Sequence, residues 1–163
     1  MNTDIIRSLC EFTEWANQRV LNVAAILTSE EYHRDFGYAW GTLHRTLTHM
    51  YAVEWLALKR AQGMSPPAMP DTADVPDRTA LQVHWSALNA ERQEYLQRLS
   101  DEMLDQIIRY TTTRGEEYSN LVWQILMHAV NHSTEHRSQA ARILTELGQP
   151  PPSLDLIAFY RSE

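Results

Sequence analysis

The chain has 163 residues, 44% hydrophobic and 21% charged, which is typical of one globular domain and predicts a single domain over residues 1–163. Its formal net charge of -7 disfavours nucleic acid as a partner, because an acidic surface repels the phosphate backbone. No apolar run is long enough to span a membrane, the first residues lack the pattern of a signal peptide, and the lone Cys10 excludes an internal disulfide, so we expect a cytoplasmic protein without a membrane partner.

Helical periodicity dominates the first part of the chain. Apolar side chains recur at steps of three and four over residues 4–27, which predicts a helix whose N-cap is Thr3 or Asp4. Residues 28–31 predict a break and a fresh short turn. A second helix is expected over residues 40–62, and because it is apolar on most sides, we expect it to be largely buried.

Proline then interrupts the helical pattern. Four prolines between residues 64 and 76 predict an irregular connection, because their rings are incompatible with helix interiors and central strands. Asp77 can cap a third helix, which the next apolar stripe predicts over residues 78–99. The connection between the second and third helices is therefore long.

The last third of the chain begins with a different pattern. Residues 106–118 favour extended structure with a turn at Arg114-Gly115, which predicts a short hairpin or a structured loop. A final long helix is expected over residues 120–147, with Ser119 as its N-cap and Gly148 at its C-terminal end. Four long helices and one long crossover predict an all-α four-helix bundle, an architecture that builds metal sites from facing helices.

Three histidines lie four residues apart in the last predicted helix: His128, His132 and His136. Side chains four apart lie on one helical face, so either neighbouring pair can provide two ligands to one metal ion. All three cannot reach one ion from a straight helix, because they span about 12 Å along its axis. The spacing leaves open which pair binds, and a structural role for the row remains the alternative.

Two side chains of the second predicted helix are candidates for a metal ligand and for a buried ion pair. His49 lies on a helix that we expect to be buried, where an imidazole needs a partner such as a metal ion. Glu54 falls within an apolar stripe, so its carboxylate must be paired, and Arg19 or Arg137 could be the partner. A structural ion pair is favoured over a catalytic role for Glu54, and no general base is evident.

Four stretches in a fixed order resemble a known family. They are Trp-Ala-Asn-Gln-Arg at 15–19, Gly41 to Trp55 of the second helix, His128 to Arg137 of the last, and the ending Gly-Gln-Pro-Pro-Pro-Ser-Leu-Asp at 148–155. Together they resemble the DinB/YfiT-like superfamily of metal-binding four-helix bundles, which is unrelated to the DNA polymerase of the same name. The resemblance implies that His49, His132 and His136 are the metal ligands, and it leaves His128 a packing role.

The resemblance also implies a function. Three imidazoles leave a position open on a divalent ion, which is the catalytic pattern, and zinc or nickel is the expected metal. Some relatives transfer a low-molecular-weight bacterial thiol, so we expect a metal-dependent transferase acting on small electrophiles, in a homodimer. The alternatives are a metal-dependent hydrolase, a non-catalytic metal- or small-molecule-binding stress protein, and a structural dimer whose histidines fill the core.

Overall fold

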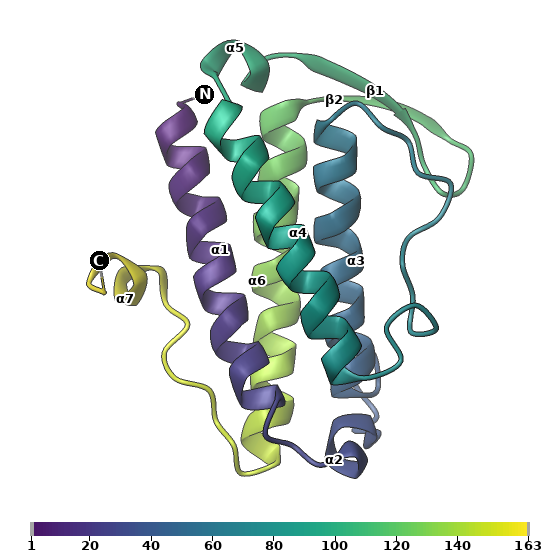
Figure 1. Ribbon diagram of the computed structural model, residues 1–163, viewed down its shortest axis with the longest axis vertical. Coiled ribbons are helices and arrows are strands. Elements are labelled where there is room, and N and C mark those ends of the chain that lie inside the picture. Colours follow the sequence, from purple (N-terminus) through teal and green to yellow (C-terminus); the bar gives the residue numbers. More distant parts are fainter. Residues whose placement is uncertain (1, 163) are drawn as a thin grey trace.

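A computed structural model describes residues 2–162 and shows an all-α fold built on four long helices, as the sequence predicts (Figure 1). The long helices are α1 (Thr3–Ala24), α3 (Leu43–Ala61), α4 (Arg78–Arg98) and α6 (Val122–Glu146). Three short helices accompany them: α2 (Ser29–His33), α5 (Asp101–Leu104) and α7 (Leu156–Tyr160). The chain also forms two short strands, β1 (Ile107–Thr111) and β2 (Glu117–Leu121).

The direction of the helices explains the long crossover. α3 and α4 run in one direction and α1 and α6 in the other, so the chain must return along the bundle between α3 and α4 (Figure 1). The proline-containing segment 62–77 makes this return outside the bundle, as an irregular connection with no long helix. The antiparallel helices α3 and α6 share the most extensive contact among the described elements, and the histidines lie on these two helices.

Two predicted N-caps are wrong, each for a local reason, and the second predicted helix starts at Leu43 rather than at residue 40. α1 begins at Thr3, and its N-cap is Asn2, whose side-chain oxygen accepts hydrogen bonds from the backbone of Asp4 and Ile5. Ser119 does not cap α6, because it lies in β2, where it pairs with Arg109 of β1. At the start of α6 the side chain of Gln124 accepts the backbone N–H of Leu121 instead.

The extended segment before α6 is a hairpin, as predicted. β1 and β2 are antiparallel, with Ile107 opposite Leu121 and Thr111 opposite Glu117. Gly115 has φ +83°, so the turn uses a backbone conformation that glycine adopts without strain. The hairpin lies over one end of the bundle, where α3 ends and α6 begins (Figure 1).

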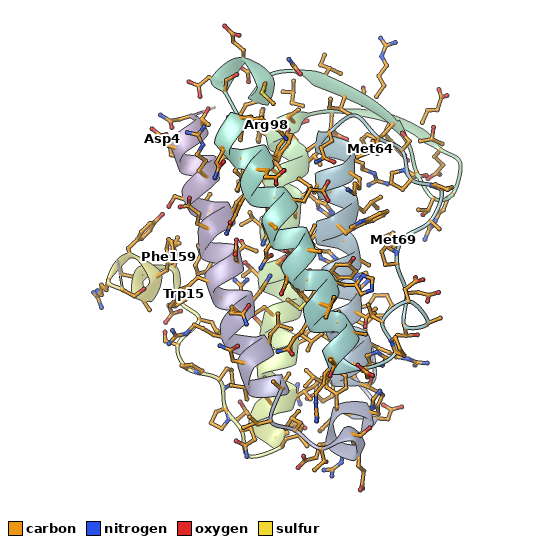
Figure 2. All side chains as sticks on the ribbon, in the orientation of Figure 1. Asp4, Trp15, Met64, Met69, Arg98 and Phe159 are labelled. Carbon is orange, nitrogen blue, oxygen red and sulfur yellow. The ribbon has the colours of Figure 1, made fainter. Side chains whose placement is uncertain are left out.

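The C-terminal segment packs on α1 through a small aromatic cluster that the sequence did not predict. Phe159 of α7 lies beside Trp15, with ring centroids 5.7 Å apart, and beside Phe12 at 6.0 Å (Figure 2). Edge contacts of this kind add stability beyond the burial of apolar area. None of the helices within residues 2–162 combines the length and apolar character needed to cross a bilayer.

Candidate metal centre

Three histidine side chains converge between α3 and α6. The ring nitrogens of His49, His132 and His136 available for ligation all lie within 4.8 Å of one another. His49 Nε2 and His132 Nε2 are 3.0 Å apart, and the rings of His132 and His136 are 4.3 Å apart between centroids. Because α3 and α6 are antiparallel neighbours, one turn of α6 presents its histidine pair to a single imidazole of α3.

The geometry of this trio fits a divalent cation. Two nitrogens that each lie about 2.0–2.1 Å from one ion are about 3.0–3.5 Å apart, which matches His49 and His132. At this distance one imidazole can donate an N–H···N hydrogen bond to the other, whereas a bound cation would accept the lone pairs of both Nε2 atoms. The Nδ1 atom of His132 is buried and has no hydrogen-bond partner. The three histidines could therefore hold a metal ion, and within residues 2–162 no cysteine or carboxylate joins them.

Burial keeps the imidazoles of His49 and His132 neutral. Burial, together with the nearby His136, lowers the pKa of His49 to about 4. Burial also lowers the pKa of His132 to about 4, with smaller contributions from His136, His49 and His128. Since a metal ion binds the neutral imidazole, both side chains are in the ligating form at neutral pH.

Two neighbouring side chains orient the trio. His136 Nδ1 donates to the side-chain oxygen of Gln139 at 2.7 Å, which leaves Nε2 free to act as the ligand. Trp40 stacks on His49, with centroids 4.0 Å apart and planes 28° apart. Trp40 is 45% exposed and follows Ala39, whose φ of +52° is strained for a residue with a side chain.

The remaining histidines stay outside the trio. His128 is exposed, and its ring lies 5.7 Å from that of His132. His44 is buried and its Nε2 bonds the backbone oxygen of Val75 at 2.7 Å, so it anchors the crossover. The structure therefore brings together the second of the two pairs that the spacing left open.

A buried polar network lies beside the trio and joins all four long helices. Glu54 of α3 accepts hydrogen bonds from Asn17 of α1 and Ser133 of α6, each at 2.6 Å. Its other oxygen accepts from Arg92 of α4 at 2.5 Å. Arg137 donates to Asn17 at 3.1 Å rather than to Glu54. The network fixes the position of α6 against α3 at Ser133, next to His132.

The predicted partners of Glu54 are therefore wrong. Arg137 bonds Asn17, and the guanidinium of Arg19 lies over the ring of Trp15 at 4.4 Å. The ion pair is made by Arg92 of α4, a partner that the sequence did not predict. Although burial alone would lower the pKa of Arg92, the adjacent Glu54 carboxylate raises it. The expectation that Glu54 forms a structural buried pair agrees with these contacts.

Two grooves flank the trio. One, of about 520 Å³, lies under the crossover and is lined by Trp40, Arg45, His49, Pro67 and Met69 among others. The other, of about 420 Å³, lies between α3, α6 and the hairpin, and its lining includes Val53, Arg60, Tyr110, Gln124 and His128. His49 lines the first groove, whereas the second is lined by His128 and by no member of the trio.

Fold and site together define a four-helix bundle with a candidate three-histidine metal centre. The chain belongs to the DinB family, whose model matches residues 1–163. It is similar to "Protein DinB" of Bacillus subtilis (strain 168), with 23% identity over 157 residues that cover 90% of this chain and 88% of that protein. The crystal structure of a DinB-like protein from Bacillus cereus ATCC 10987 shares the fold, with a TM-score of 0.59, 17% identity, and coverage of 89% of this chain and 94% of that one.

Proposed function

We propose that His49, His132 and His136 bind one divalent cation and that the protein transfers a small electrophile to a low-molecular-weight thiol. The observation that carries the proposal is the convergence of three ring nitrogens within 4.8 Å, from two helices, with no fourth ligand among residues 2–162. Three protein ligands leave the ion open to an exogenous molecule, which is the catalytic rather than the structural arrangement. Imidazole ligands suit zinc and nickel, and we propose one of these as the metal.

Two grooves beside one centre favour a reaction with two substrates. A hydrolase needs space for one organic substrate and water, whereas a transferase must hold two organic molecules at the same atom. The groove of about 520 Å³ includes His49 in its lining, the groove of about 420 Å³ includes His128, one turn from His132, and each has the size of a small-molecule site. Transfer is therefore favoured over hydrolysis and over simple storage of metal.

The protein's own residues would bind and orient the reactants. A divalent cation in this site would favour the thiolate form of a thiol, which is the nucleophile. The thiolate sulfur attacks the electrophilic carbon, a C–S bond forms, the leaving group departs with its electron pair, and the thiol proton passes to solvent. Trp40 covers His49 and excludes water from that side, while Gln139 holds His136 in the ligating orientation.

Metal content and turnover test the two halves of the proposal separately. Plasma emission spectrometry is expected to find about one zinc or nickel per chain, lost in His49→Ala and His132→Ala. His128→Ala is the matched control, because it removes an imidazole one turn away on the same helix, and it should keep the metal. Equal metal content in His132→Ala and wild type would contradict the site.

For turnover, metal-loaded protein is incubated with a thiol and a panel of alkyl halides, epoxides and activated esters, and products are identified by mass spectrometry. A thioether formed by the wild type, but not by His132→Ala, supports transfer. Hydrolysed electrophile without a thioether would show a hydrolase instead. Metal binding without any product would indicate a binding protein.

A further inference from the structure

The groove beside the hairpin contains a cationic side chain without a counter-ion. Arg60 of α3 lines it and is half-buried, and its Nε atom is buried with no hydrogen-bond partner. Among the described residues Arg60 forms no ion pair, whereas Lys59 before it pairs with Glu91. No aspartate or glutamate lines the groove. This is unusual in a chain with a net charge of -7.

The guanidinium of Arg60 is held in place. It lies over the ring of Tyr110 of the hairpin, 4.4 Å from the centroid, and the Tyr110 hydroxyl donates to Asn120 at 2.8 Å. A stacked guanidinium keeps its planar N–H fork free to bind an anion. Burial lowers the pKa of Arg60, because the charged form loses water without gaining a counter-ion.

The other polar groups of the groove are donors as well. Gln124 uses its side-chain oxygen to accept the backbone N–H of Leu121 at 3.0 Å and the Asn120 amide at 3.2 Å. This fixes the orientation of the Gln124 amide and leaves its NH₂ group without a partner in the described structure. The free polar groups of the groove are therefore the Arg60 fork, the Gln124 amide and the His128 imidazole, and they match an acceptor that carries negative charge.

One end of the groove is lined by residues that lie one helical turn from the histidine trio on α3 and on α6. Val53 lies one turn after His49 on α3, and His128 lies one turn before His132 on α6, with its ring 5.7 Å away. Arg60 lies eleven residues after His49, about 16 Å along the helix, and helical side chains lean toward the N-terminus, which here means toward the trio. The floor between the two ends is apolar, with Leu56 and Ile125.

We propose that Arg60, assisted by Gln124 and His128, is a subsite for the carboxylate of an elongated small molecule whose reacting thiol lies at the histidine trio. A single guanidinium provides one fixed charge and two parallel donors, which match a carboxylate. The inference rests on the proposed metal-thiol chemistry for the second end of the ligand. The carboxylate end depends only on the groove and can be tested without metal.

The first experiment uses metal-free protein, with octanoate and octanamide as probes that differ only in charge. Binding is followed by calorimetry and by NMR shifts of the Tyr110 and His128 rings. We expect octanoate to bind at least tenfold more tightly than octanamide, and Arg60→Gln to remove this preference. Arg45→Gln is the matched control, because it removes an equal charge from the other groove and should leave the preference unchanged. Equal binding of the two probes to wild type would overturn the subsite.

The second experiment uses metal-loaded protein and a series of thiols that vary in length. Mercaptooctanoate should bind more tightly than mercaptooctanol, whereas mercaptopropionate is too short to reach both ends and should lack its advantage. Arg60→Gln should abolish the advantage of mercaptooctanoate and leave mercaptooctanol unchanged. If octanoate binds but thiols gain nothing from metal, the metal-thiol function fails and the carboxylate subsite stands. If thiols bind through the metal but carboxylates confer no preference, the subsite fails and the function stands.

Discussion

Glu54 and His132 are polar side chains on facing helices inside the same bundle, but their surroundings differ. The carboxylate of Glu54 accepts three hydrogen bonds from three other helices. His132 has one nitrogen facing another imidazole and a buried Nδ1 with no partner. A buried polar group with all its partners holds helices together, and one without them loses stability unless a ligand supplies the missing interaction. The Glu54 network is thus satisfied within the protein, whereas the trio has ring nitrogens that could hold a metal ion.

The largest expected effect comes from breaking the network. Glu54→Leu leaves the Arg92 charge buried without its partner, which costs about 3–5 kcal/mol. Urea denaturation of metal-free protein measures this loss as a lower midpoint with an unchanged slope. The control is the double variant Glu54→Leu/Arg92→Leu, which replaces the pair by apolar groups and should recover much of the stability. A loss below about 1 kcal/mol in the single variant would show that the network contributes little.

A smaller effect is expected from the support of the trio. Gln139→Leu removes the acceptor that orients His136, and loss of such a group lowers metal affinity about 10–100-fold. A competitive titration against a chromogenic chelator measures the affinity. Ser138→Ala is the neighbouring control, since Ser138 is exposed and its hydroxyl bonds only the backbone of Thr134. Equal affinities for the Gln139→Leu variant and wild type would exclude an orienting role.

A still smaller effect is expected when the trio is broken in metal-free protein. His132→Leu removes an imidazole whose Nδ1 is unpartnered, so the free energy of unfolding should change by less than about 1 kcal/mol. The same denaturation experiment as for Glu54→Leu makes the two values directly comparable. If His132→Leu lost as much stability as Glu54→Leu, the trio would be a structural core cluster rather than a ligand site.

The sequence predicted the bundle well because long helices have a strong 3.6-residue period. It missed α7, whose five residues after a proline run are too short for a period. It also missed Arg92 as the partner of Glu54, because spacing along a helix gives the direction of a side chain and not the helix that faces it. Tertiary contacts between α3 and α4 decide that choice.

The candidate site was likewise predicted only in part from the sequence. The histidine row identified α6, but only the resemblance chose His132 and His136 over His128. Gln139 was missed although it follows His136 by three residues, a spacing at which helical side chains can bond. Trp40 was not predictable as a partner of His49, because its position depends on the strained backbone at Ala39.

The smallest expected effect concerns the thiol of Cys10, whose pKa is influenced by Glu54 and Arg92 of the network. This thiol is buried, and burial raises its pKa from 9.0 to about 11, with Glu54 adding to the rise and Arg92 opposing it. The folded state therefore favours the neutral thiol, a contribution to stability that is complete below pH 9.0 and is lost as pH rises through about 11. Alkylation of the folded protein by iodoacetamide should be slow at pH 8 and should rise about tenfold for each pH unit, because only the thiolate reacts.

Glu54→Leu should shift this alkylation profile to lower pH. Without the Glu54 carboxylate, the positive charge of Arg92 is opposed at Cys10 only by the smaller contribution of Glu11, and it favours the thiolate. The midpoint of the profile, rather than the rate at one pH, separates this charge effect from increased opening of a destabilised fold, which would raise the rate at every pH. His132→Leu removes no charge from the network and should keep the wild-type midpoint. A Glu54→Leu profile with an unchanged midpoint would mean that the field of Arg92 does not reach the thiol.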